Sequence, residues 1–227
     1  MPLSDIEVRV LGALMEKERT TPDGYPLSAQ ALVTACNQRT NREPVTDYHL
    51  QEVLAAVSRL RDRGLAETIQ ELGDRVPKHG HKAARALELD ARQFAVVAVL
   101  LLRGEQTPGE LRARTDRYVE FGSVGAVEET LNSLSGRSAP LARNLGRSPG
   151  QSQDRWTHTL GTDEEKMVPR VRPPRSDAAA GGDGATAAGS TGLEQRGGHV
   201  VTRAEYEELE SRLRTLERRV SLLETGH

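Results

Sequence analysis

Apolar residues recur at helical spacing along two neighbouring stretches in the first third of the chain. Ser28 can cap the first predicted helix, and Thr46 can cap the second, over residues 46–60. The apolar face of the first consists of Leu32, Val33 and Cys36. That of the second consists of Leu50, Val53, Leu54, Val57 and Leu60. A polar connection joins the two stretches, so the pattern predicts a helix-turn-helix pair.

A helix before this pair and a hairpin after it complete a larger unit. Ser4 and Glu7 have the spacing of a capping box, and the helix they begin is predicted to end near Lys17. Residues 66–69 and 84–89 read as the two strands of the hairpin, with a turn at Gly73 and Asp74. This order predicts a winged helix-turn-helix domain over residues 1–89.

The same order of elements recurs in residues 90–161. Asp90 can cap a helix that Gly104 ends, and Thr107 opens the next one. A third helix carries Val124, Val127, Leu131 and Leu134, and strand patterns follow at 140–145 and 155–160. The sequence therefore predicts a mainly α fold with small β-hairpin wings, an α+β protein built from two tandem winged helix-turn-helix domains.

The chain changes character after residue 161. Residues 162–200 lack periodicity and are rich in Ala and Gly, which predicts a flexible, disordered linker. Residues 201–225 regain a heptad pattern, and the predicted oligomerisation residues are Tyr206, Leu209, Leu213, Leu216, Val220 and Leu223. In a parallel dimer Arg212 would face Glu217 of the second copy. We expect a C-terminal coiled-coil helix and a homo-oligomer; an amphipathic helix that docks on its own chain is the alternative.

Composition limits the partners that the protein can have. The formal net charge is −2, and residues 1–160 carry as many acidic as basic side chains, so a DNA-binding surface must be local. The longest apolar run, 94–102, is far shorter than the roughly 18 residues of a membrane span. No secretory signal pattern is present at the N-terminus, and the single cysteine, Cys36, fits a reducing compartment. We expect a cytoplasmic protein without a membrane partner.

Enzymatic chemistry finds little support in the sequence. It contains no Gly-rich phosphate loop, nucleophile elbow or paired-carboxylate motif. His79 and His81 could ligate a metal, but a third ligand at matching spacing is missing, so solvated histidines in the wing are the preferred interpretation. Trp156 is interpreted as a strand residue of the second core. We expect a non-enzymatic protein with no catalytic residues, no cofactor and no metal.

The first unit offers candidates for contact with double-stranded DNA. Its predicted nucleic-acid-binding residues are Arg39, Arg42, Tyr48, Gln51, Arg59, Arg75, Lys78 and Lys82. The helix over 46–60 would read base edges while the basic wing binds phosphates. Asp47 and Glu52 oppose this hypothesis. The alternatives are that the wing is merely solvated, and that Arg42 pairs with Glu43 or another nearby acid.

The second unit is a poorer candidate for base readout, because its third helix exposes Glu128, Glu129 and Asn132. We expect that helix to pack or to bind a protein partner, while the arginines of its hairpin leave phosphate contact open. Two functions therefore remain, and the first is the one we expect. The first is DNA binding through the first winged helix, as in a transcriptional regulator. The second is a protein–protein interaction scaffold that uses winged helices as docking modules without nucleic acid.

Several longer motifs resemble those of the bacterial YceH-like family. They are Tyr-Pro-Leu-Ser at 25–28, Ala-Cys-Asn-Gln at 35–38 and Thr-Asn-Arg-Glu-Pro-Val at 40–45, with further matches at 75–78, 100–104 and 106–112. The resemblance covers roughly residues 5–160. It implies a tandem winged-helix fold. Because the family is uncharacterised, it implies neither a ligand nor catalytic residues.

Overall fold

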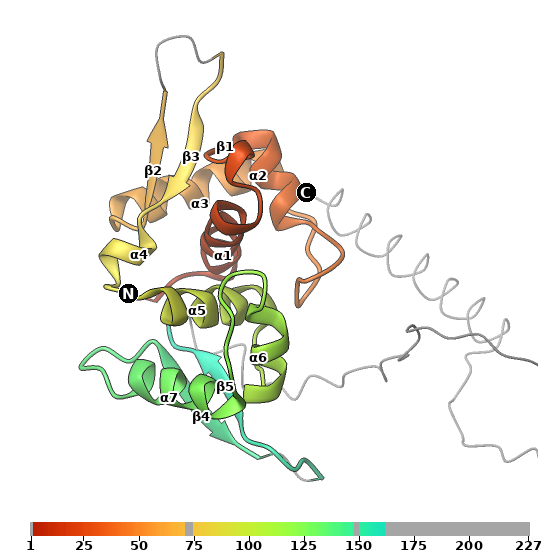
Figure 1. Ribbon diagram of the computed structural model, residues 1–227. Helices are drawn as coiled ribbons and strands as arrows, with labels where there is room; N and C mark the ends of the chain where they lie inside the picture. The colour runs from red at the N-terminus through yellow and green to blue at the C-terminus, as the bar shows by residue number, and fades with distance from the viewer. Residues whose placement is uncertain (1, 71–74, 148–149, 162–227) are drawn as a thin grey trace, which may run out of the picture. The chain divides into compact units, whose positions relative to one another are not determined.

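The computed structural model describes residues 2–70, 75–147 and 150–161, which belong to the first of two units, Met1–Arg172 (Figure 1). Helices and small antiparallel sheets make this unit a mixed α+β structure, as the sequence predicted. The predicted linker at 162–200 and the predicted helix at 201–225 lie outside the described residues. The oligomerisation residues within that helix therefore stay a prediction.

In the first half, up to residue 89, one short strand comes before the second and third α-helices, and a hairpin and a short fourth α-helix follow them. Its elements are α1 (Asp5–Thr20), η1 (Pro22–Gly24), β1 (Leu27–Ser28), α2 (Ala29–Cys36), α3 (Leu50–Asp62), β2 (Ala66–Ile69), β3 (Lys78–His81) and α4 (Ala83–Ala86). The elements of the second half are α5 (Ala91–Arg103), α6 (Pro108–Thr115), α7 (Val124–Ser135), β4 (Ala142–Gly146) and β5 (Arg155–His158).

Local capping fixes most of the helix starts at the residues that the sequence indicated. The Ser4 backbone N–H donates to the Glu7 carboxylate at 2.7 Å, which closes the capping box of α1. The Asp90 carboxylate accepts from the Gln93 N–H at 2.8 Å, and α5 ends at Gly104, whose φ is +66°. These interactions satisfy backbone groups that the helix itself leaves unpaired.

The two halves repeat one strand arrangement. In the first half β3 lies between β1 and β2, all antiparallel, and Leu27 pairs with His79. In the second half β4 pairs with β5, and Gln106 forms an isolated bridge with Trp156. Leu27 and Gln106 each stand directly before the residue that caps a helix, α2 and α6 respectively. A single bridge in the second half thus occupies the place of β1 in the first.

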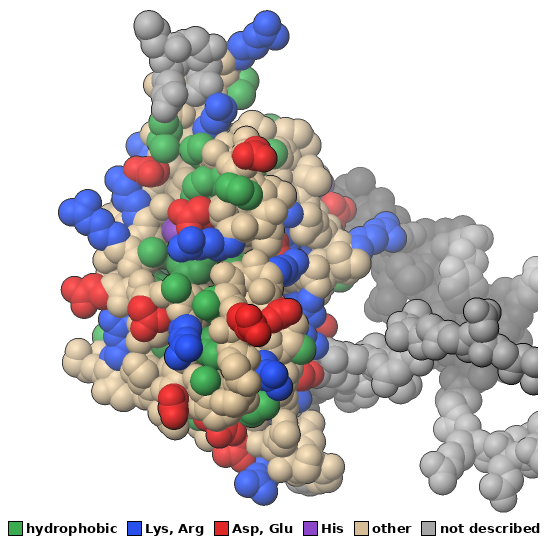
Figure 2. Space-filling view, in the orientation of Figure 1, with side chains coloured by type: hydrophobic (Ala, Val, Ile, Leu, Met, Phe, Trp, Pro, Cys, Tyr) green, Lys and Arg blue, Asp and Glu red, His purple; other side chains and the backbone are tan. Residues whose placement is uncertain are grey.

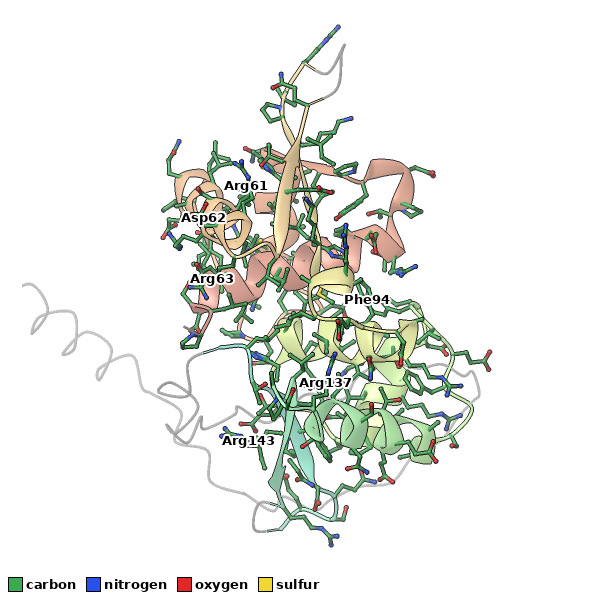
Figure 3. All side chains as sticks on the ribbon, turned by 90° about the vertical axis from the view of Figure 1, so that its left-hand side faces the viewer. Arg61, Asp62, Arg63, Phe94, Arg137 and Arg143 are labelled. Carbon is green, nitrogen blue, oxygen red and sulfur yellow. The ribbon has the colours of Figure 1, made fainter. Side chains whose placement is uncertain are left out.

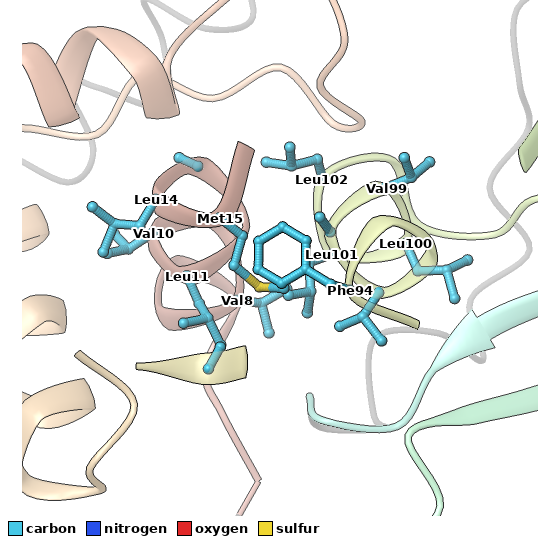
Figure 4. Close-up of a cluster of buried hydrophobic side chains, with 14 of the residues drawn as sticks. Val8, Val10, Leu11, Leu14, Met15, Phe94, Val99, Leu100, Leu101 and Leu102 are labelled. Atoms are coloured by element: carbon cyan, nitrogen blue, oxygen red, sulfur yellow. The ribbon is translucent and has the colours of Figure 1, made fainter. Parts of the chain in front are cut away.

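The halves share one hydrophobic core, in which α1 packs against α5 (Figure 4). Gly12 lies at this contact: a Cβ there would stand 3.0 Å from the Cβ of Leu101 and from side-chain atoms of Leu102. The absence of a side chain at residue 12 therefore lets the two helices approach closely. The ends of the described unit also meet, since the Leu3 N–H donates to the Leu160 carbonyl at 2.7 Å.

The second predicted helix begins later than expected, at Leu50 instead of Thr46, and the prediction that Thr46 caps it is wrong. The side chain of Asn37 bonds the backbone of Tyr48 on both sides, its Nδ2 donating at 2.8 Å and its Oδ1 accepting at 2.9 Å. Thr46 turns inward and accepts a hydrogen bond from Arg9. His49 and Glu52 form the capping box that starts α3. Long-range contacts thus hold residues 46–49 in an extended segment.

The return strand of the hairpin is Lys78–His81, not residues 84–89 as predicted. The Lys82 N–H donates to the Leu65 carbonyl at 2.8 Å, which brings the strand back to the end of α3. After it the chain forms the short helix α4, rich in alanine, the residue with the highest helix propensity. His79 and His81 consequently lie in the sheet, where their side chains are buried. The interpretation of solvated wing histidines is wrong.

Candidate functional site

A groove of about 530 Å³ lies between α3, the start of α2 and the β2–β3 hairpin. Its apolar lining comes from Leu50, Leu54, Val57, Val76 and Pro77, and its polar lining includes Ser58, Thr68 and Arg61. Grooves of this size with a mainly apolar lining and a few polar groups are typical binding sites. This makes the face formed by α3 and the hairpin the strongest candidate site in the described part of the chain.

Two of the groove residues leave large apolar side chains in contact with solvent. Leu50 is 37% exposed and Val76 is 50% exposed. Single exposed apolar residues need no explanation, but two that line the same groove extend its apolar floor to the surface. The groove can therefore bury apolar groups of a ligand.

The sequence of α3 builds this surface by carrying more apolar residues than its core contacts use. Val53, Ala56 and Leu60 are fully buried against the body of the first half. Leu50 and Leu54, one helical turn apart, face the groove instead. The apolar face of α3 is thus wide enough to pack in the core on one side and to line the groove on the other.

Positive charge borders the groove at the C-terminal end of α3 and on the hairpin. Arg61 is exposed, and its guanidinium forms no ion pair with another described residue. Figure 3 shows Arg61, Asp62 and Arg63 following one another at this end of α3, on the side of the molecule that carries the hairpin. Arg75 is also exposed, and Lys78 is half-buried. In Figure 2, basic and apolar side chains lie next to each other along the hairpin, while acidic and basic groups are mixed lower on that face.

Arg42, predicted to contact DNA, is buried. Its guanidinium forms an ion pair with Glu16 of α1 and donates to the carbonyls of Ala35 and Asn41, both at 3.0 Å. The side chain has no exposed surface, so it cannot reach a nucleic acid without leaving these partners. We remove Arg42 from the candidate surface. The alternative that it pairs with a nearby acid agrees with the structure, and the acid is Glu16.

Other predicted contact residues are engaged elsewhere. The Arg59 Nε lies 2.7 Å from a carboxylate oxygen of Glu7, and the Lys82 Nζ lies 2.9 Å from that of Glu67. Tyr48 precedes α3 and does not stand on it. Gln51 on α3, Arg39 in the loop before it and Arg75 on the hairpin are exposed. Arg59 and Lys82 are exposed as well but ion-paired, and Lys78 is partly covered.

The sheet histidines form hydrogen bonds within the first half. The His79 Nδ1 lies 3.1 Å from the Thr68 hydroxyl, and the His81 Nδ1 accepts from the Ala83 N–H at 3.2 Å. Burial lowers the pKa of both imidazoles. No group of three metal-ligating side chains occurs among the residues that the structure describes. Cys36 is also inert, because burial raises the pKa of its thiol to about 12.

The sequence reasoning missed Arg61, Val76 and Pro77 as site residues. A signal for the groove was present in the second helix, whose five apolar residues exceed what a helix packed on one side needs. No local signal marked the hairpin residues, because their proximity to α3 depends on the position of β3. Which face of the helix carries the site follows only from the fold.

The second half has a different surface. Glu128, Glu129 and Asn132 of α7 are exposed, as predicted, and Trp156 is buried in the core. Two hairpin arginines are engaged: Arg155 lies 3.2 Å from the Glu110 carboxylate and Arg147 lies 2.9 Å from that of Asp154. This half therefore offers few unpaired cations. No helix in the described residues has both the length and the apolar content to cross a bilayer.

These features define a small α+β protein with an open apolar groove bordered by arginine. Residues 3–151 match the family described as a protein of unknown function, DUF480. The chain belongs to this family. It is 45% identical over 173 residues to the UPF0502 protein of Geotalea uraniireducens, covering 76% of this chain and 78% of that protein. It is 41% identical over 179 residues to the UPF0502 protein YceH of Salmonella paratyphi B, covering 77% and 83% respectively.

Proposed function

We propose that each half of the described unit is a winged helix and that the protein is a non-enzymatic docking module of the cytoplasm. In this proposal the groove between α3 and the hairpin binds a segment of another polypeptide. The observation that carries the proposal is the apolar groove itself, with Leu50 and Val76 partly exposed along it. Nucleic acid offers phosphates and polar base edges to a protein surface, and few groups that an apolar floor would favour.

The charges around the groove indicate the chemistry of the partner. Arg61 lines the groove, and Arg75 and Lys78 stand on the hairpin next to it. A peptide with two apolar side chains and a neighbouring Asp or Glu would match both features, since the carboxylate could pair with Arg61. Amphipathic segments that place such residues in a hydrophobic groove are a common recognition mode.

Double-stranded DNA is the second candidate, favoured by a different observation. Gln51 and Ser58 are exposed on α3, the helix that would enter a major groove, and Arg61 and Arg75 could bind phosphates on either side. Such binding would weaken steeply with salt, because each phosphate contact releases counterions. The exposed Glu52 on the same helix and the loss of Arg42 from the surface count against this candidate.

Selection from a library of displayed dodecapeptides tests the proposal. The wild-type chain is the target, and the Leu54→Asp variant removes peptides that bind elsewhere. We expect enriched sequences with a pair of apolar residues flanked by Asp or Glu. Leu54→Asp and Arg61→Glu should each weaken binding of such a peptide by at least about tenfold. Gln30→Ala serves as a groove-edge control that keeps the floor intact.

Fluorescence anisotropy with a mixed-sequence DNA duplex at low and physiological salt, on the same variants, separates the two candidates. Arg61→Glu should weaken both ligands, but Leu54→Asp should weaken peptide binding more than any duplex binding. Enrichment of no peptide over the Leu54→Asp target, together with salt-sensitive duplex binding, would replace the docking proposal by the DNA proposal. Absence of both activities would overturn both.

A further inference from the structure

Basic side chains gather where the loop of residues 37–49 meets α5 and the segment after α6. We call this cluster the arginine junction; it consists of Arg42, Arg103, Arg114 and Arg117 with the carboxylates of Glu16 and Glu110. It joins α1 and the first-half loop to the second half and lies apart from the groove residues. Arginines outnumber carboxylates here. An arginine that has no carboxylate partner is therefore available to bind an anion.

Glu16 already has two arginine partners. Its buried carboxylate pairs with Arg42, and its Oε1 lies 2.5 Å from an NH2 group of Arg117. Both carboxylate oxygens are thus used. The side chain of Arg117 nevertheless stays 39% exposed, with its guanidinium 5.3 Å from the centre of the Tyr118 ring.

Glu110 is also fully engaged. Its carboxylate accepts from Arg155 at 3.2 Å and from the Thr107 N–H at 3.0 Å, and it lies 3.6 Å from Arg114. These contacts belong to the start of α6 and to β5. No further carboxylate of the described residues is paired with Arg103.

The charge of Arg103 is only partly balanced, by the carboxylate of Glu16. Its guanidinium donates to the side-chain oxygen of Asn41, a neutral acceptor, and forms no ion pair with another described residue. Desolvation by burial is the main cause that lowers the pKa of Arg103 to about 10; the positive charges of Arg114 and Arg117 lower it further, whereas Tyr118 and Glu16 oppose the shift. A half-buried cation beside two like charges is unfavourable unless an anion neutralises it.

We propose that Arg103 and Arg117 form a binding site for a phosphate group. Planar guanidinium forks match phosphate oxygens in pairs of hydrogen bonds, and two arginines that share one anion bind more tightly than one. The exposed part of Arg117 provides access, while Asn41 and Glu16 hold the two side chains in place. The phosphate belongs either to a small molecule or to a nucleic-acid backbone. This site is independent of the proposed groove function.

Inorganic pyrophosphate is the probe that tests the site. The melting temperature of the full chain is measured against pyrophosphate, with sodium chloride added to constant ionic strength. At about ten times Kd, linkage predicts a rise of roughly 4 °C for the wild type. Arg103→Gln and Arg117→Gln should abolish the rise. Arg85→Gln, which removes an exposed cation from α4, should leave it unchanged.

A second readout does not depend on unfolding. Binding should broaden the phosphorus NMR line of pyrophosphate with the wild type and with Arg85→Gln, but not with Arg117→Gln, whose side chain lies at the rim of the junction. A ten-nucleotide oligothymidine then identifies the source of the phosphate. A larger rise in melting temperature than with pyrophosphate assigns the site to a nucleic-acid backbone, and a smaller rise assigns it to a small molecule. Equal stabilisation of wild type and Arg103→Gln, or no stabilisation of either, would overturn the proposal.

Discussion

The amide side chain of Asn37 holds the backbone of Tyr48 at two points, donating to its carbonyl at 2.8 Å and accepting from its N–H at 2.9 Å. This double hydrogen bond closes the loop between α2 and α3 and sets α3 to begin at Leu50. Because Leu50 lines the groove, an asparagine outside the groove determines one of its walls.

Substitution of Asn37 tests this relationship. Asn37→Ala removes both hydrogen bonds and should lower the free energy of unfolding by about 1–3 kcal/mol, as expected for a partly buried pair of polar contacts. Asn37→Asp keeps the acceptor but places a carboxylate oxygen against the Tyr48 carbonyl, so it should destabilise as well. Urea unfolding measures both. An Asn37→Ala variant as stable as the wild type would contradict the role given to this side chain.

The buried pair of Glu16 and Arg42 predicts a strong asymmetry between single and double variants. Glu16→Met leaves the Arg42 charge buried without its partner and should cost about 3–5 kcal/mol. Replacing both residues by methionine removes the unpaired charge and should recover most of that loss. Glu120→Met, an exposed acid, is the matched control and should change stability by less than about 0.5 kcal/mol. Equal effects of Glu16→Met and the double variant would show that the pair is not coupled.

Gly12 and Gly125 make opposite predictions for the same substitution. Alanine favours a helix over glycine by about 1 kcal/mol. At Gly12 a Cβ would meet Leu101 and Leu102 at 3.0 Å, so overpacking should exceed this gain and Gly12→Ala should destabilise by about 1–3 kcal/mol. At Gly125 the nearest atom is 3.7 Å away, so Gly125→Ala should stabilise. Thermal unfolding of the two variants checks the sign of each effect.

Stability should decrease in acid because of the sheet histidines. Burial is the main cause that lowers the pKa of both; Arg61 lowers that of His79 further, whereas Glu18 opposes the shift at His81. A folded-state pKa below the unfolded value near 6.5 means that the unfolded chain binds more protons as the pH falls. This contribution to stability is therefore present above about pH 6.5 and is lost below it.

Urea unfolding at pH 7.5 and 5.5 measures this loss. His79→Gln/His81→Gln should have a smaller difference in free energy of unfolding between the two pH values than the wild type. Carboxylates contribute to the pH dependence of stability in both proteins. Subtracting the pH difference of the variant from that of the wild type therefore leaves the contribution of the two histidines. An unchanged difference in the double variant would contradict their burial as neutral groups.

Local chemistry made several elements predictable from the sequence. The capping residues Ser4, Asp90 and Thr107 act on backbone groups within three positions, so their helices begin where the pattern indicated. Thr46 has the same local signal, yet Asn37, nine residues earlier, holds the following segment in extended form. A long-range contact therefore overrides the capping signal of Thr46, and local sequence rules do not include such contacts.

In the candidate site too, some residues could be predicted from local sequence, whereas others depend on long-range contacts. Gln51 and Arg75 could be placed on the first-half surface from the helix and hairpin patterns. Arg42 could not be excluded, because its partner Glu16 lies 26 residues away on α1. The burial of His81 likewise depends on Tyr25 and Phe94, whose rings lie 6.1 and 5.5 Å from its own. Such pairings become known only with the fold.

The most direct test of the docking proposal is a fluorescent reporter in the groove. Ser58→Cys places a thiol on the groove lining, and the buried Cys36 does not compete for labelling. An environment-sensitive dye at residue 58 should change its emission as a selected peptide saturates the site, and Leu54→Asp should remove the change. The same dye at Ser138→Cys, exposed in the second half, should not respond. A response at residue 138 alone, or at residue 58 to duplex DNA but not to peptide, would contradict the proposal that this groove binds polypeptide.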